Sequence, residues 1–164
     1  MVIVKPGVSH LSRESRVWIF QSSRYIDTDL SDVLVKELGD FLSTWAAHGA
    51  QLFSGFELKF GRFLIIAVDE NHASATGCSI DKLMRFVQKI ESQHGLDLLN
   101  RMQVAYRQDS EIMVCDVNEF RSLLTANKVN SETIVFNNLV QDMASYRASW
   151  EVPVKESWHA NLLP

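Results

Sequence analysis

The segment from residue 69 to residue 81 gathers more chemically capable side chains than any other part of the chain. Its sequence is Asp-Glu-Asn-His-Ala-Ser-Ala-Thr-Gly-Cys-Ser-Ile-Asp, so acids, a histidine, hydroxyls and a thiol lie close together. An apolar run precedes this segment and a helical pattern follows it. Binding and catalytic residues concentrate on loops that rigid elements position. We therefore expect a functional site, if the chain has one, in this loop.

Anion binding is the first chemistry that fits the loop. Gly77 would let a ligand approach, and the free amides at the start of the following helix would point at it. Asp81 argues against an anion because it already supplies negative charge in the first turn, and an ordinary helix cap on Ser79 explains the same residues. The candidate ligand-binding residues are Arg24, Ser74, Thr76, Gly77 and Ser79.

A reactive thiol is the second chemistry. Cys78 is predicted at a helix N-terminus, where backbone amides stabilise a thiolate, and His72 or His48 would act as its base. The candidate catalytic residues are Cys78, His72 and Asp69. The competing interpretation is a small buried cysteine beside the helix cap, because free cysteines are usually buried and inert. Cys115 lies in an apolar strand pattern and is predicted to be core.

A metal ion is the third chemistry, with Asp69, Glu70 and His72 as its ligands. The residue types suit a metal, but their spacing matches no metal-binding motif. A solvated polar loop explains these residues equally well. The sequence therefore predicts no metal site, and it leaves the identity of any cofactor unknown.

Several nucleotide and hydrolase motifs are absent from the sequence. No glycine is followed by lysine, which excludes a phosphate-binding P-loop, and there is no Gly-x-Gly-x-x-Gly fingerprint. Cys-x-x-Cys, His-Glu-x-x-His and Gly-x-Ser-x-Gly are also missing. We therefore expect no ATP hydrolysis of the P-loop type.

Composition sets further limits on function. Apolar residues make up 46% of the 164 residues and the formal net charge is −4, which is typical of a globular protein and argues against nucleic acid as a partner. The longest apolar run, 63–68, is far too short to span a bilayer, so we expect no membrane insertion. With only two cysteines, the chain suits a cytoplasmic, reducing location.

Hydrophobic periodicity predicts the elements that would position the loop. In chain order the pattern gives a strand at 17–20, a helix that Asp27 or Thr28 caps and Gly49 stops, two strands at 53–60 and 63–68, a helix from near Ser79 that Gly95 ends, and a strand at 104–107. This is the ferredoxin-like order of an α+β fold. The continuously apolar first and third strands are expected to be central, parallel and adjacent. The loops after them, which contain Ser22, Ser23 and Arg24 and residues 69–79, would then meet.

The remaining residues predict three parts of the chain. Residues 1–16 form an irregular arm, 17–108 the ferredoxin-like unit, and 109–164 a C-terminal α/β extension packed on it, since no flexible linker separates them. In this extension Asn137 and Asn138 lie between apolar residues, which indicates a turn with asparagine side chains bonded to backbone. His10, His94 and His159 are expected on the surface.

Several segments spread along the chain resemble one protein family. They are Trp45-Ala-Ala-His-Gly49, Val68-Asp-Glu70, Gly77-Cys-Ser-Ile-Asp81, Phe136-Asn-Asn-Leu-Val140 and Trp150-x-x-Pro153. Together they resemble short, uncharacterised bacterial proteins often labelled "ABC transporter ATPase". That label implies nucleotide hydrolysis, yet the chain lacks both the Walker A loop and a Leu-Ser-Gly-Gly-Gln signature. The family supplies no catalytic residues to transfer.

A second resemblance covers residues 111–158. The run Val117-x-x-Phe120-x-x-Leu123-Leu124, the strand 133–136 and Trp150 look like the small GYF-related modules of bacterial proteins. Such modules imply interaction surfaces. The leading interpretation is thus a non-catalytic binding or protein-interaction protein, with an unknown small molecule or protein as its partner and an undetermined oligomeric state. The alternative is a small enzyme or anion-binding domain that uses the 69–81 loop.

Overall fold

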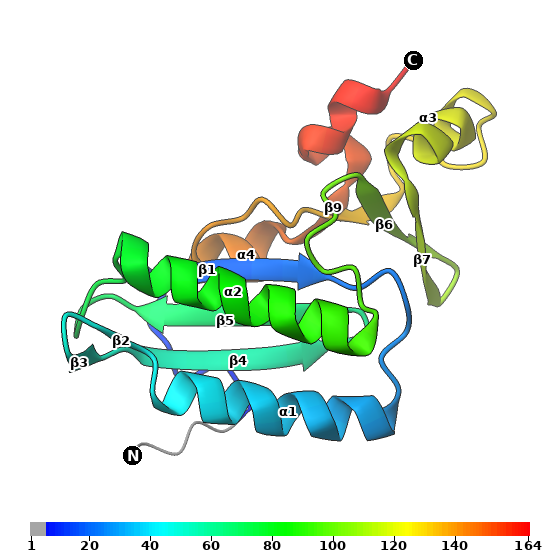
Figure 1. The fold of residues 1–164 in the computed structure, drawn as a ribbon. Helices are drawn as coiled ribbons and strands as arrows, with labels where there is room; N and C mark the ends of the chain where they lie inside the picture. Colours follow the sequence, from blue (N-terminus) through cyan, green and yellow to red (C-terminus); the bar gives the residue numbers. More distant parts are fainter. Residues whose placement is uncertain (1–5) are drawn as a thin grey trace.

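A computed structural model describes residues 6–164 of the chain, and it confirms the α+β class (Figure 1). Helices α1 and α2 cover one face of a three-stranded sheet, and a second unit containing a four-stranded sheet lies beside strand β1 (Figure 1). The two units share a buried core. The strand order of each unit determines which strand edges and loops lie next to the other unit.

The three-stranded sheet contains β1 (Arg16–Gln21), β5 (Phe63–Asp69) and β4 (Phe53–Lys59) in the order β1-β5-β4. Both pairs are antiparallel. Every residue of β5 is buried, as expected for a central strand covered on both faces.

The predicted place of the first strand is wrong in two respects. β1 lies at the edge of its sheet, and it runs antiparallel to β5 instead of parallel. Its unbroken apolar sequence has another cause, since both of its faces are covered. Phe20 packs into the core beneath the helices, whereas Val17 packs into the core on the opposite face. An unbroken apolar strand sequence thus indicates that both faces of the strand are buried. It does not indicate that the strand lies in the centre of its sheet.

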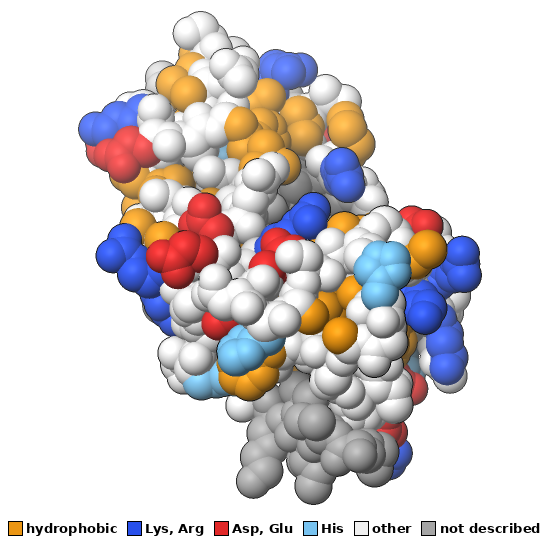
Figure 2. Space-filling model, turned by 90° about the vertical axis from the view of Figure 1, so that its left-hand side faces the viewer, with side chains coloured by type: hydrophobic (Ala, Val, Ile, Leu, Met, Phe, Trp, Pro, Cys, Tyr) orange, Lys and Arg blue, Asp and Glu red, His pale blue; other side chains and the backbone are white. Residues whose placement is uncertain are grey.

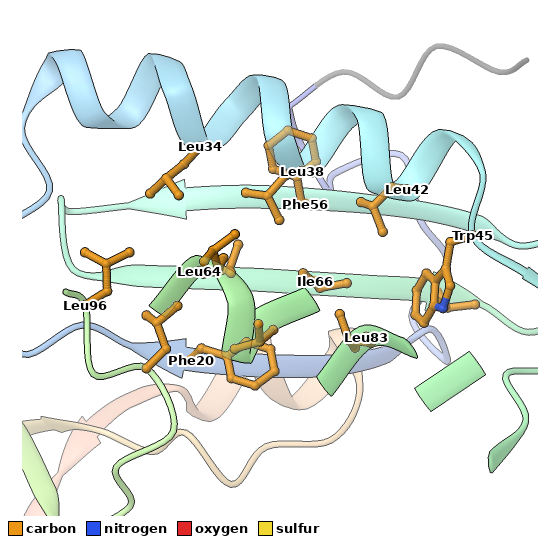
Figure 3. Packing of buried hydrophobic residues seen from close by; sticks show 14 of the residues in the cluster. Phe20, Leu34, Leu38, Leu42, Trp45, Phe56, Leu64, Ile66, Leu83 and Leu96 are labelled. Carbon is orange, nitrogen blue, oxygen red and sulfur yellow. The ribbon is translucent and has the colours of Figure 1, made fainter. Parts of the chain in front are cut away.

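Two amphipathic helices form the cover on the first face. The helices are α1 (Thr28–Ser43), which Asp27 caps, and α2 (Gly77–His94), which ends at Gly95 in the left-handed conformation with φ 64°. Figure 3 shows apolar side chains of both helices meeting those of the strands. The fully buried members include Leu38, Phe56 and Leu83.

The ends of both helices differ from the prediction. α1 stops at Ser43, before the expected end, because residues 46–51 form a small hairpin of β2 (Ala46–Ala47) and β3 (Ala50–Gln51), with His48 and Gly49 at positive φ in its turn. The N-cap of α2 is Thr76 and not Ser79. Ser79 occupies the third helical position and completes a capping box with Thr76.

The second unit contains a four-stranded sheet in the order β7-β6-β8-β9. Its elements are β6 (Gln103–Gln108), β7 (Glu111–Asp116), α3 (Val117–Thr125), β8 (Ile134–Phe136), α4 (Met143–Ser149), β9 (Glu151–Pro153) and the 3-10 helices η1 (Val154–Glu156) and η2 (Trp158–Leu162). The predicted fourth strand, β6, pairs here with β7 and β8 and does not join β1. The ferredoxin-like arrangement is therefore not confirmed.

The two units meet over a common core. Phe63, Ile65 and Ala67 of β5 pack in the same buried cluster as Phe136 and Trp150 of the second unit. Helix α4 closes this face, and its start pairs with the residues before β1 through a bond of 2.9 Å from the Met143 amide to the Ser15 carbonyl. Residues 141–143, which follow β8 in the chain, thereby lie beside the beginning of β1.

Candidate ligand-binding cleft

In the 69–81 loop, hydrogen bonds within the loop engage the side chains of Asp69, Glu70, Thr76 and Ser79. The buried carboxylate of Asp69 accepts the amide of Asn71 at 3.0 Å, and this bond holds the pKa of Asp69 below its usual value. Glu70 accepts the amide of Ala75 at 3.0 Å. These carboxylates hold the loop backbone in place.

The start of α2 is similarly occupied. Ser79 Oγ accepts the Thr76 amide at 2.7 Å, and Thr76 Oγ1 accepts the Ser79 amide at 3.3 Å. Ser79 is buried, whereas Ser74 and Gly77 are exposed. The predicted anion-binding hydroxyls are thus arranged as a helix cap.

The candidate thiol lies on the surface. Cys78 is exposed, and no hydrogen bond links it to His72 or Asp69 within residues 6–164. The exposed ring of His72 packs against Phe53 with 4.8 Å between the ring centroids. Asp69, His72 and Cys78 are absent from the lining of the large cleft described below. Cys115 is buried, as predicted.

The loop after β1 does not reach the 69–81 loop, contrary to the prediction. Because β1 and β5 are antiparallel, Gln21 lies opposite Phe63 while Arg16 lies opposite Val68. The Ser22 amide accordingly donates to the Arg62 carbonyl at 2.7 Å. Ser22, Ser23 and Arg24 therefore lie at the other end of the sheet, roughly 20 Å away for six strand residues. The prediction failed because it assumed parallel strands.

No group of three or more histidine, cysteine, aspartate or glutamate side chains could hold a metal ion within residues 6–164. Asp69, Glu70 and His72 therefore do not form a metal-binding group in the described part of the chain.

A large cleft lies between the two units, along β1. Its volume is about 880 Å³, within the range of small-molecule sites. The side chains of β1 contribute one wall, the segments 98–103 and 136–142 the others, and Trp158 and His159 complete it. Figure 2, which shows one side of the molecule, has a waist between two lobes with acidic and basic side chains along it.

The lining combines apolar, amide and charged side chains. It includes Trp18, Ile19, Met84, Leu98, Leu99, Phe136, Leu139, Val140 and Trp158 among the apolar residues, Gln21, Asn100, Gln103, Asn138, Gln141 and His159 among the polar ones, and Glu14, Arg16, Glu70, Arg101 and Asp142 among the charged ones. Apolar walls with a few placed polar groups are the usual composition of a ligand site.

A chain of hydrogen bonds fixes the orientation of one amide in this wall. The indole of Trp150 donates to Asn138 Oδ1 at 2.9 Å, and an indole can only donate. The other end of the Asn138 amide must therefore be its NH₂, which donates to Gln21 Oε1 at 2.9 Å. Gln21 consequently presents Nε2 as a pure donor.

That donor lacks a hydrogen-bond acceptor among the described residues. Gln21 is 6% exposed, and its Nε2 is buried without a hydrogen-bond acceptor in the described part of the chain. Gln103 also lines the cleft, and its buried Oε1 has no hydrogen-bond donor among residues 6–164. Leaving a buried polar atom unpaired costs about 1–3 kcal/mol, so each position favours a partner that arrives from outside.

The far wall carries a neutral imidazole. His159 is 1% exposed, and burial lowers its pKa to about 4, so it is uncharged at neutral pH. Its Nδ1 lies 2.6 Å from Ser157 Oγ, and its ring stacks on Trp158 with 3.9 Å between centroids. The expected surface position of His159 is wrong, because the terminal 3-10 helix folds back onto the second unit.

Sequence reasoning missed Gln21, Asn138 and His159 as residues of a site. The one available signal was the polar pair between apolar residues at 137–138. Asn137 does form the predicted turn, since its Oδ1 accepts the Leu139 amide at 3.2 Å. Asn138 instead bonds to side chains, and one of them is 117 positions away in sequence.

No protein-family model, curated protein or solved structure matches the chain. The resemblance to the short bacterial family and to GYF-related modules stays a prediction. Within residues 6–164, none of the helices combines the length and apolarity needed to cross a membrane.

Proposed function

We propose that the protein is a non-catalytic binding protein whose cleft along β1 takes a ligand bearing a carbonyl group. The observation that carries this proposal is the oriented, buried and unpartnered Nε2 of Gln21 in the cleft wall. A ligand carbonyl would accept this donor and remove the cost of an unpaired amide.

The walls favour a ligand with a flat or apolar body beside that carbonyl. Trp18 and Trp158 line the cleft, and the Arg16 guanidinium lies 5.0 Å from the centroid of the Trp18 ring. The neutral His159 adds a polar group without adding charge. This arrangement suits recognition of an uncharged amide-like group.

Benzamide is a suitable first probe because it joins a carboxamide to an aromatic ring. We expect its addition to shift the side-chain NH₂ resonances of Gln21 and the indole resonance of Trp158 in ¹⁵N-resolved NMR spectra. An absence of such shifts up to millimolar benzamide would contradict the proposal.

The matched variants are Gln21→Glu and Gln88→Glu. Gln21→Glu keeps the oxygen that accepts Asn138 but removes the donor, so benzamide should bind at least tenfold more weakly at neutral pH. Gln88 is exposed on α2, outside the cleft lining, and its variant should bind as the wild type does. Unchanged binding by a folded Gln21→Glu protein would overturn the assignment.

A further inference from the structure

The outer edge of β1 carries backbone groups that find no hydrogen-bond partner among residues 6–164. Hydrogen bonding alternates along an edge strand, so every second residue points its N–H and C=O outward. Val17 points outward because its amide donates to the Gln141 carbonyl at 2.9 Å. Ser22, an even-numbered residue, instead donates towards β5. Ile19 and Gln21 therefore point their backbone groups outward.

The open stretch lies between two paired ends. At one end Arg16 forms an antiparallel bridge with Asp142, and at the other the Ser23 amide donates to the Leu96 carbonyl at 3.0 Å. Between these ends, the outward groups of Ile19 and Gln21 make no backbone hydrogen bond within residues 6–164. Residues 16–21 all line the cleft, so this edge is one of its walls.

Residues 141 and 142 already pair with the beginning of this edge. The bridge to Asp142 and the bond to Gln141 begin an antiparallel ladder, which breaks off where the chain turns away towards Val140. Figure 1 shows β1 at the outside of its sheet, next to the second unit. An occupant that continued the ladder would add a fourth strand to the order β1-β5-β4.

We propose, building on the proposed function of the cleft, that its ligand is an extended polypeptide segment that pairs antiparallel with Ile19 and Gln21 of β1. Peptide addition to an exposed sheet edge obtains affinity from main-chain hydrogen bonds. The two outward residues repeat at the two-residue spacing of a strand, roughly 7 Å, which a peptide matches along its length. About four peptide residues, roughly 13 Å of strand, would cover the open edge.

The buried side-chain amides suit the same occupant. Gln21 Nε2 donates and Gln103 Oε1 accepts, and both lack partners within residues 6–164. A peptide group supplies a carbonyl for the first and an N–H for the second. Apolar lining residues such as Leu139, which is 63% exposed, would contact peptide side chains.

The probe is a phage-displayed library of random nine-residue peptides, selected on the full-length protein and eluted with benzamide. We expect enriched peptides whose synthetic versions shift the backbone amide resonances of Ile19 and Gln21. Methylating the peptide nitrogens one at a time should weaken binding at least tenfold at alternate positions, because only every second N–H faces β1. Sensitivity without alternation would overturn the strand-pairing proposal.

Ile19→Pro tests the edge from the side of the protein. Proline removes the outward N–H and is tolerated on edge strands, while the bonds to β5 come from Trp18 and Phe20. Peptide affinity should fall at least tenfold in Ile19→Pro and stay within twofold in Ile19→Val. If Ile19→Pro does not fold, the methylation series still decides the question.

Benzamide binding separates the two proposals. If benzamide shifts Gln21 but no selected peptide competes with it, the peptide inference fails and the cleft proposal stands. If neither binds in the cleft, both fail. A concentration-dependent dimer that protects Ile19 from amide exchange without added peptide would also overturn the inference, because a second copy would then be the occupant.

Discussion

His159 shows how one side chain near the C-terminus acquires a role through burial. The ring is enclosed between Trp158 and Phe120, and its pKa falls to about 4 because burial disfavours the charged form. The folded protein therefore holds a neutral imidazole in a wall of the cleft, where a charged one would repel cationic ligands.

The depressed pKa of His159 predicts a loss of stability in acid. The unfolded chain protonates this group near pH 6.5, whereas the folded protein resists protonation down to about pH 4. The contribution of neutral His159 to the free energy of unfolding should be fully present above about pH 6.5. It should fall by up to about 3 kcal/mol as the pH drops to 4. Urea unfolding across this range should show a smaller fall in His159→Gln. An identical slope in His159→Gln and the wild type would contradict the prediction.

The two cysteines should differ in reactivity. Cys115 is buried, and burial raises its pKa to about 11, so little thiolate is present at neutral pH. Cys78 is exposed at the start of α2. We expect iodoacetamide at pH 8 to modify Cys78 at least tenfold faster than Cys115, as measured by mass spectrometry of the folded protein. Equal rates would mean that Cys78 is protected, and the thiol interpretation would then lose its basis.

At the scale of the elements, Trp45 joins the end of α1 to the start of α2. It lies beyond the last residue of α1, is 2% exposed, and donates its indole N–H to the Ser79 carbonyl at 2.8 Å. The ring belongs to the core beneath the helices, although the residue sits after α1 and not on its face. The bond holds the capping box of α2 against the sheet.

Replacing Trp45 should be costly for this reason. Trp45→Ala should lower the free energy of unfolding by about 3–5 kcal/mol, because a large buried ring is lost. Trp45→Phe keeps most of the ring but loses the indole hydrogen bond to the Ser79 carbonyl, so about 0.5–1.5 kcal/mol is expected. Chemical denaturation of both variants measures the difference. An unchanged midpoint for Trp45→Ala would show that the ring does not anchor the two helices.

At the scale of the whole molecule, the shared core joins the two units. Trp150 of the second unit contacts Phe63 of β5 at 4.9 Å between ring centroids and Phe136 of β8 at 5.0 Å. Either unit alone would expose this apolar face to water. The two units that form the walls of the cleft are thus held together by this shared core.

This packing predicts one cooperative unfolding transition. Trp150→Ala should lower stability by about 3–5 kcal/mol and reduce hydrogen-exchange protection in β5 and β6 to the same extent. Native-state hydrogen exchange with mass spectrometry gives both regions in one experiment. If β5 kept its protection while β6 lost it, the two units would be independent domains.

Several elements depend only on neighbours along the chain and could be predicted from the residues alone. Asp27 caps α1, Gly95 ends α2, and the alternating and continuous apolar runs become β4 and β5. These features follow from side-chain periodicity and from backbone preferences within a few residues, so local reasoning reaches them.

The pairing of the strand edges and the lining of the cleft depend instead on contacts between distant parts of the folded chain. Strand β6 pairs with β7 and β8 and not with β1, and this pairing leaves the outer edge of β1 open. Gln21 becomes a fixed donor only because Asn138, 117 residues later, and Trp150 orient it. Burial and hydrogen-bond geometry between such distant residues are properties of the folded chain, and no local pattern encodes them.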